Sequence, residues 1–471
     1  MKSIVSFFCI VISIVLFAFS LSIESANLIL FSIIFVYFGI LIRCSVDWHK
    51  NLSYLLFVSF VFAFLLSRTF YRWTAGMQLE EFFSDTLVYD SLKYITVSLL
   101  TIYFGMILFG KKYSNESLVD YHNEENHGAE LSVAKVLFYC GAICKIYITF
   151  VKIVLINTVG YVSSYLELTD TIKGVPYIIS KFSDIYLISF IIILALLPDY
   201  QKIKKCVWTF LFVSILGIFT GVRSSFFLPL VFLFWYLSYI NYFKETRFKD
   251  RITGKKILLL ILGLYVCCVL IGLIGKTRVG QPVTAEIFNP FKTIAENIGG
   301  SNLVLIRTFQ VEDSVSAEEG ITFLFGPFLN FFNNNVFTQM LFPSSVPAYG
   351  TVEYALNGRN FGSYLTYTWD RAFYMTGGGY GSSYIAEAYI AGGYLAIVII
   401  TLLYAYFLAL PYKIRLRNWI SRAIVFTMMY SLFYASRDAA LYFLTSGINI
   451  TNLFVILVVY LLGSTRKRGT R

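Results

Sequence analysis

Charged residues are scarce in this chain of 471 residues: only 14% are Asp, Glu, Lys or Arg, whereas 58% are hydrophobic. A soluble globular protein carries about 25% charged residues. Too few polar side chains are present to cover a soluble fold of this length. The net charge of +11 falls in short segments between apolar runs and in the tails. It therefore indicates membrane topology, and we expect no nucleic-acid partner.

Histidine and cysteine are also scarce, with three and seven residues respectively. The cysteines lie within or beside apolar runs, which argues against a disulfide framework. The sequence contains no nucleotide-binding glycine loop, no Ser/His/Asp set and no zinc-ligand spacing. We therefore expect no metal ion and no other cofactor.

Long apolar runs make up most of what remains. A membrane-spanning helix needs about 20 predominantly apolar residues. The sequence therefore predicts an all-α polytopic membrane protein, with a retained first span and about twelve transmembrane helices. The runs are residues 4–21, 27–43, 52–68, 92–110, 133–157, 178–197, 206–220, 226–243, 257–275, 385–410, 423–436 and 447–463.

Lysine and arginine alternate between the connecting segments in a way that predicts the topology. Basic residues are concentrated in segments 43–50, 111–112, 202–205, 244–256, 413–422 and 466–471, and are few in the segments between. Because cytoplasmic loops carry the excess of positive charge, both termini are predicted to be cytoplasmic. His49, His122 and His127 then all face the cytoplasm. Chemistry on the outer face would have to rely on arginine and carboxylate groups.

Two predicted loops are longer than the rest. Residues 276–384 form an extracytoplasmic loop with six basic and eight acidic residues. Its apolar stretches at 321–332 and 336–342 are too short to span, so we expect short interfacial helices there. Residues 111–132 form a polar cytoplasmic loop. The whole chain, 1–471, is then one membrane domain.

Several charged residues lie at predicted span ends on the outer side. Arg223 falls in the tight turn between two short spans; it is either a snorkelling arginine or a functional group, and a guanidinium suits phosphate. Arg437 and Asp438 follow another short span, as a structural ion pair or as functional groups. Lys276 and Arg278 follow the ninth span, where they either anchor the loop or bind an anion.

Further candidates lie in the large loop and just after it. Glu387 stands near the start of the tenth span, where it could act as a general base or pair with an arginine. A glycine-rich stretch at 377–381 precedes it and would allow a sharp return of the chain. Arg307 and Arg371 are charged loop residues. Lys145 and Lys152, seven residues apart in the fifth span, share a helical face and should line a polar interior.

The order of these features resembles the O-antigen polymerases (Wzy) and related oligosaccharide repeat-unit polymerases of bacterial envelopes. The resemblance covers essentially the whole chain. It rests on the segments Gly221-Val222-Arg223-Ser224, Leu341-Phe342-Pro343-Ser344, Gly381-Ser382-Ser383 with Glu387-Ala388-Tyr389 and Gly392-Gly393-Tyr394-Leu395, and Arg437-Asp438.

This resemblance implies a GT-C-like membrane glycosyltransferase in the bacterial cytoplasmic membrane. Such enzymes join repeat units carried on undecaprenyl diphosphate at the outer face, without a metal. The implied partners are lipid-linked glycans, membrane lipid and, as a candidate, a chain-length regulator protein. The product would be O-antigen or a related surface polysaccharide.

The resemblance also suggests roles for the candidate residues. Catalysis would fall to Arg223, Glu387, Arg437 and Asp438. The leaving diphosphate would bind Arg223, Lys276, Arg278 and Arg437. The glycan would contact Arg307, Arg371, Tyr367 and Trp369, the last two by stacking on sugar faces.

Two other functions remain open at this point. A lipid-linked oligosaccharide flippase or other transporter also places charges within the membrane, but it would not need so large an outer loop. An O-antigen ligase would share the architecture. Ligases are understood to use a histidine in the outer loop, and residues 276–384 contain none.

Overall fold

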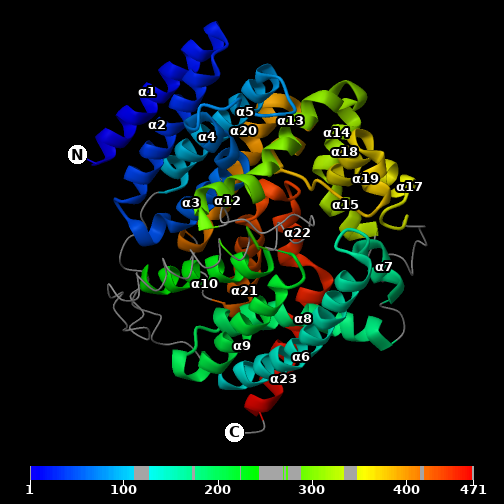
Figure 1. Ribbon diagram of the computed structural model, residues 1–471. Coiled ribbons are helices and arrows are strands. Elements are labelled where there is room, and N and C mark those ends of the chain that lie inside the picture. Colours follow the sequence, from blue (N-terminus) through cyan, green and yellow to red (C-terminus); the bar gives the residue numbers. More distant parts are fainter. Residues whose placement is uncertain are drawn as a thin grey trace.

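The structure is a computed structural model. It describes residues 2–110, 127–171, 175–222, 224–242, 269, 272–273, 288–333, 347–413 and 418–468. Within those ranges every regular element is a helix (Figure 1).

The helices fall into an N-terminal part, a middle part of short helices and a C-terminal part. The N-terminal part holds α1 (Lys2–Ile23), α2 (Ala26–Cys44), α3 (Trp48–Val61), η1 (Phe62–Leu66), α4 (Ser67–Thr74), α5 (Asp85–Phe109), α6 (Gly128–Val159), α7 (Ser164–Thr171), α8 (Val175–Ala195), α9 (Tyr200–Ile218) and α10 (Ser224–Tyr242). The middle part holds α12 (Pro290–Asn297), η6 (Gly299–Ser301), α13 (Asn302–Val311), η7 (Glu312–Ser314), α14 (Ala317–Leu324), α15 (Gly326–Asn333), α17 (Val352–Asn357), α18 (Phe361–Trp369) and α19 (Arg371–Met375). The C-terminal part holds α20 (Tyr384–Lys413), α21 (Trp419–Leu432), η8 (Ala435–Arg437), α22 (Tyr442–Ile448) and α23 (Ile450–Arg468).

Eight of the described helical segments are long and apolar enough to cross a membrane. They are Lys2–Ile23, Ala26–Cys44, Trp48–Thr74, Asp85–Phe109, Gly128–Val159, Pro176–Ala195, Tyr384–Tyr412 and Tyr442–Thr465. This confirms a multi-pass, all-α membrane protein.

The predicted count of twelve spans is not confirmed. Helices α9, α10 and α21 occupy three further predicted runs, but they do not meet the length and composition of a span. Three lysines at the start of α9 account for that helix, whereas α10 is apolar but counts only as a shorter helix, Ser224–Ile240. The run at 257–275 lies almost wholly outside the described residues. Of the polar loop predicted at 111–132, residues 111–126 lie outside the described residues, and α6 begins at Gly128.

Small residues allow the long helices to approach one another closely. In the α1–α2 pair, the Ser13 and Ser32 hydroxyls are 2.8 Å apart, and Ser6 Oγ donates to the Gly39 carbonyl at 2.7 Å. Where α5 crosses α20, a Cβ added to Gly105 would lie only 2.3 Å from the Cβ of Ala405. These contacts replace the hydrophobic effect, which does not drive helices together inside lipid.

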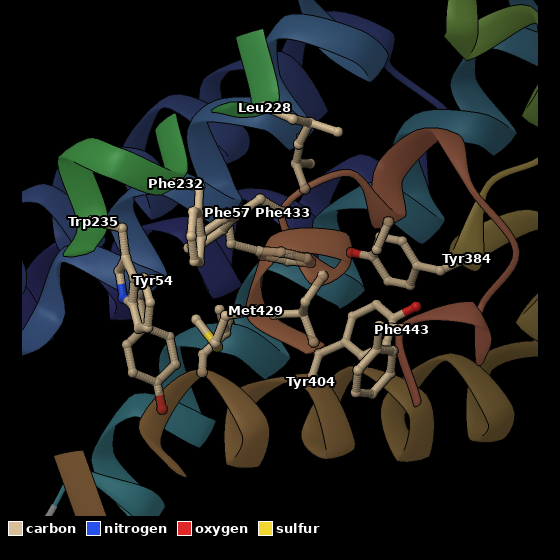
Figure 2. Close-up of a cluster of buried hydrophobic side chains, with 14 of the residues drawn as sticks. Tyr54, Phe57, Leu228, Phe232, Trp235, Tyr384, Tyr404, Met429, Phe433 and Phe443 are labelled. Carbon is tan, nitrogen blue, oxygen red and sulfur yellow. The ribbon is translucent and has the colours of Figure 1, made fainter. Parts of the chain in front are cut away.

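A buried aromatic cluster joins α3, α10, α20, α21 and α22 at the centre of the protein (Figure 2). Trp235 on α10 donates its indole N–H to Ser53 Oγ on α3 at 2.8 Å, so its polar atom is satisfied. The labelled members are Tyr54, Phe57, Leu228, Phe232, Trp235, Tyr384, Tyr404, Met429, Phe433 and Phe443. Aromatic packing of this kind gives the neighbouring cavities a rigid wall.

The middle part differs from the spans because its helices are short, as the sequence predicts for the large loop. Side chains at the N-termini define where several of them begin: Asn289, Ser316, Thr351, Asn360 and Asp370 each accept a hydrogen bond from the first turn of the following helix. Such caps satisfy backbone N–H groups that a short helix leaves free. Most of these helices gather beside α20 at the upper right of Figure 1.

Candidate active site

Two neighbouring cavities lie next to the aromatic cluster. The apolar cavity, of about 620 Å³, is lined by Phe60 and Phe64 from α3 and η1, by Val231 from α10, by Ile294 from α12, and by the glycine-rich loop 377–381. The polar cavity, of about 1110 Å³, combines hydroxyl, amide and charged side chains with aromatic and aliphatic ones, from α6, α8, α9, α10, α15 and α21 to α23. The protein therefore places a mainly apolar pocket beside one that also carries many polar side chains.

The turn between α9 and α10 forms part of the boundary between the two cavities. Val222 and Ser224, together with Leu228 and Tyr434, line both cavities. Gly221 has a φ of +70°, a left-handed conformation that glycine adopts without steric cost. Arg223 itself lies outside the described residues, but its two neighbours in sequence stand where the cavities meet.

Arg437 and Asp438 are consecutive in sequence, yet they line different cavities. Arg437 lines the apolar cavity and Asp438 lines the polar cavity. Arg437 ends the short helix η8, and Asp438 follows with extended backbone angles of φ −134° and ψ 169°. The backbone thus changes from helical to extended between the two residues, and their side chains line different cavities.

Arg437 presents a cation to the apolar cavity. Its Nη1 donates to Ser301 Oγ at 3.2 Å, and its guanidinium carbon lies 5.9 Å from the centre of the Phe64 ring. In the part of the chain that the structure describes, no carboxylate lies within ion-pairing distance of Arg437. Its charge thus remains for an anionic ligand.

Two arginines on α4 behave differently. Arg68 pairs with Glu80 at 2.6 Å, and Arg72 pairs with Glu81 at 2.7 Å. The hydrogen bond and charge of Arg72 hold the pKa of Glu81 below its usual range. These ion pairs stabilise the segment after α4, whereas Arg437 lacks such a role.

Asp438 is half-buried and presents a carboxylate to the polar cavity. Its Oδ1 accepts a hydrogen bond from the Ala439 backbone N–H at 2.8 Å. Burial raises the pKa of Asp438 to about 7, against the weaker opposing effect of that hydrogen bond. A carboxylate with a pKa near neutrality is suited to accept a proton from a substrate.

Glu387 lies close to this site but lines neither cavity. It is only 1% exposed. Ser382 Oγ donates to its Oε1 at 2.7 Å, and the Ala440 backbone N–H donates to its Oε2 at 2.8 Å. Glu387 therefore ties the end of the glycine-rich loop to the turn that carries Asp438. This geometry suits a positioning residue.

The glycine-rich loop approaches the segment around α7 too closely for larger residues. Gly377 has a φ of +93°, and an added Cβ would lie 2.9 Å from both Leu166 Cγ and the Val162 carbonyl oxygen. Tyr161, Val162 and Tyr165 also line the apolar cavity. Glycine is required here because the backbone both turns and makes close contact.

The loop residues predicted to bind glycan line neither cavity, and their two arginines make three cation–π contacts. The Arg307 guanidinium lies 3.6 Å from the centre of the Tyr380 ring and 5.3 Å from that of Trp369. Burial lowers the pKa of Arg307. Arg371 lies 5.4 Å from the centre of the Tyr367 ring. The pairing of these arginines with aromatic rings is clear, but their predicted contact with glycan stays a prediction.

Lys276 and Arg278, and the segment Leu341-Phe342-Pro343-Ser344, lie outside the described residues.

The sequence predicts Lys145 as a residue of a polar interior, and it does line the polar cavity. Sequence reasoning missed Lys181 and Asp184, which line the same cavity. The signal was present, since two charges three residues apart interrupt the apolar run 178–197.

The comparison with known families identifies the chain. The model of the O-antigen polysaccharide polymerase Wzy family matches residues 4–468. This chain belongs to the Wzy family. Comparisons with curated proteins and with solved structures gave no match. Wzy membership confirms the resemblance seen in the sequence, and it gives the chain the general function of an O-antigen polymerase, a glycosyltransferase-like membrane enzyme of polysaccharide biosynthesis.

Proposed function

We propose that the protein polymerises oligosaccharide repeat units carried on undecaprenyl diphosphate, at the outer face of the bacterial cytoplasmic membrane, and that the two cavities hold the reacting substrates. The observation that carries this proposal is the divergence of Arg437 and Asp438. A cation in an apolar cavity and a carboxylate in a polar cavity are separated by a single peptide bond.

The apolar cavity suits the lipid-diphosphate end of a donor. Apolar side chains such as Phe60, Phe227 and Val231 would contact prenyl carbons, and Arg437 would contact the diphosphate. A guanidinium binds phosphate oxygens through a planar fork of donors. Arg223 would add a second cation at the turn, while Lys276 and Arg278 would be further candidates.

The polar cavity suits the glycan of the acceptor. Its volume exceeds the range of about 300–1,000 Å³ common for small-molecule pockets, and its lining is rich in hydroxyl and amide groups. Asp438 is placed to accept the proton of the attacking sugar hydroxyl. Glu387 would support this step by holding the Ala440 backbone next to Asp438.

The proposed reaction exchanges one glycosidic linkage for another. The hydroxyl oxygen of the acceptor sugar forms a bond to the anomeric carbon of the donor glycan. The bond from that carbon to the diphosphate oxygen breaks, and undecaprenyl diphosphate leaves with the bonding electron pair. The hydroxyl proton passes to Asp438, while Arg437 stabilises charge on the leaving diphosphate. Arginine, rather than a metal ion, supplies this stabilisation.

The proposed topology places both termini in the cytoplasm and residues 276–384 outside. Helices α12 to α19 would then form an outer cover over the cavities, in a GT-C-like arrangement of membrane helices and outer loop. The short capped helices and the contact of α12 with the apolar cavity support this assignment. A chain-length regulator protein would have to act on this outer part or on the membrane-facing helices.

Deletion of the gene tests the proposed function. A polymerase predicts that single repeat units still reach the cell surface, so gel electrophoresis of surface polysaccharide would show one short band and no ladder. Repeat units trapped on the cytoplasmic side would instead identify a flippase. Long chains remaining on undecaprenyl diphosphate would identify a ligase. Either of the last two outcomes would refute the proposal.

A further inference from the structure

A group of charged side chains at the α6–α8 side of the polar cavity has no role in the reaction proposed above. Lys145 on α6, and Lys181 and Asp184 on α8, line that cavity. Asp184 interacts electrostatically with three lysines, namely these two and Lys152. Of the charged residues that line this end of the cavity, two lysines against one aspartate leave a formal net charge of +1, and Lys152 adds a further positive charge nearby.

The packing of α6 on α8 accounts for this cluster. A Cβ added to Gly141 would lie 2.8 Å from the backbone nitrogen of Tyr186, so the two helices cross in close contact at that point. Lys145 follows Gly141 by about one turn of α6, and Asp184 precedes Tyr186 on α8. The close crossing therefore brings charges from two membrane-spanning helices to one cavity wall.

Charged side chains within membrane spans are costly, and they are retained mainly where they pair or serve a function. In the part of the chain that the structure describes, neither Lys145 nor Lys181 forms an ion pair within 4 Å. Asp184 offsets only one of the three lysine charges. An additional anion would complete the site.

We infer that Lys145 and Lys181 bind a carboxylate of the repeat unit, so that the polymerase selects a glycan containing an acidic sugar. This inference rests on the proposed function and specifies its substrate class. Tyr442 and Asp438 line the same cavity as Asp184, so the lysine cluster shares that cavity with the proposed site of proton transfer. The carrier diphosphate is the other possible source of the anion, but it is assigned to the cavity that contains Arg437.

The test uses the purified full-length protein in lipid vesicles with two lipid-linked repeat units. One is the natural unit, and the other is an analogue in which each sugar carboxylate is replaced by a hydroxymethyl group. Charge-assisted hydrogen bonds of this kind change binding by about tenfold to a hundredfold. We expect the wild-type protein to polymerise the analogue slower by that factor.

Substitution of the lysines completes the test. Lys145→Gln and Lys181→Gln should slow polymerisation of the natural unit by a similar factor, with no added loss on the analogue. Lys145→Arg should restore most of the rate. Lys135→Gln, on the same helix but lining neither cavity, is the matched control and should leave both rates unchanged. Equal losses on both substrates would assign the lysines to the diphosphate and overturn the inference.

Two further outcomes separate this inference from the proposed function. A natural polysaccharide without any acidic sugar, or a wild-type enzyme that polymerises both units equally, would overturn the inference and leave the polymerase assignment intact. A wild-type protein that polymerises neither unit would instead refute the proposed function. Immunoblotting of the membrane fraction shows whether each variant is inserted in normal amounts.

Discussion

The apolar and polar cavities share a boundary but differ in chemistry. The apolar cavity is lined mainly by aromatic and aliphatic side chains around Arg437, whereas the polar cavity adds many hydroxyl, amide and charged groups, Asp438 among them. A substrate that joins a long hydrocarbon chain to an oligosaccharide needs both environments. On the proposed function, the enzyme would separate the two halves of such an amphipathic substrate, with Arg437 and Asp438 near the boundary between the two cavities.

The two cavities also differ in how their charges are held. Arg437 has a hydroxyl neighbour, Ser301, and a ring neighbour, Phe64. The polar cavity contains charges of both signs, from Lys145, Asp184 and Asp438. A lone cation is a site for a strong anion, whereas a mixed set provides several weaker contacts for a polyhydroxylated ligand. The first four predictions below test this division.

Removal of the cation from the apolar cavity should have the largest effect. Loss of one preorganised charge-stabilising group typically lowers a rate by about a hundredfold to a thousandfold. We expect the loss of rate in Arg437→Ala to lie at the upper end of this range. The ladder of surface polysaccharide should then be replaced by single repeat units. Arg437→Lys should retain part of the activity.

Arg72→Ala is the matched control for Arg437. Arg72 pairs with Glu81, which is 56% exposed, and it lines neither cavity. Exposed ion pairs contribute about 0–1 kcal/mol to stability, so the ladder should be nearly unchanged. Equal losses in both variants would show that Arg437 has no special role.

Removal of the carboxylate from the polar cavity should have the next largest effect. General base catalysis contributes about a hundredfold to ten-thousandfold. We expect the loss of rate in Asp438→Asn to lie at the lower end of this range, because departure of the diphosphate provides much of the driving force for the reaction. In vitro chain extension from a lipid-linked unit measures the rate, and an unchanged rate would remove Asp438 from the mechanism.

The pH dependence of Asp438 follows from its pKa of about 7. The ionised form accepts the proton, so activity should rise with pH up to about 7 and then level off. The effect on stability has the opposite sign: a carboxyl group whose pKa is raised on folding stabilises the protein most below its unfolded pKa, and this contribution falls as pH rises toward 7. Asp438→Asn should abolish the acidic limb of the rate profile.

A change at the boundary between the cavities should have a smaller effect. A non-glycine residue in the left-handed conformation costs roughly 1–2 kcal/mol. Gly221→Ala would impose this strain on the turn that lines the apolar cavity, and we expect roughly a tenfold loss of chain extension. Gly76 provides the matched control, since its φ of +66° is similar and an added Cβ would meet nothing within 4 Å. If Gly76→Ala were equally damaging, backbone strain alone would explain the result.

The sequence predicts the long helices well because their signal is local. An uninterrupted apolar run such as 4–21 predicts α1 (Lys2–Ile23) without any knowledge of its neighbours. The site depends on contacts between distant segments. Nothing in the local pattern indicates that Glu387 accepts from Ser382 and Ala440, or that Ser301 meets Arg437. The opposite orientations of Arg437 and Asp438 arise from a change of backbone conformation that the sequence does not reveal.

The smallest effect is expected at Glu387, where two substitutions distinguish a positioning residue from a catalytic one. A glutamine side chain has the same length, and its oxygen can accept from the Ala440 N–H while its amide donates to Ser382 Oγ. We therefore expect Glu387→Gln to reduce chain extension by less than about tenfold, because roughly one charge-assisted hydrogen bond is weakened.

Glu387→Ala should be more harmful than Glu387→Gln, because it leaves the buried Ala440 N–H without an acceptor, which costs about 1–3 kcal/mol. That loss should appear as a lower amount of folded protein in the membrane as well as a lower rate. The relative activities of the two variants distinguish a general base from a positioning residue. A general base would lose as much activity in Glu387→Gln as Asp438 loses in Asp438→Asn, because an amide cannot accept the proton. A positioning residue tolerates the amide and fails only when the hydrogen bonds are removed.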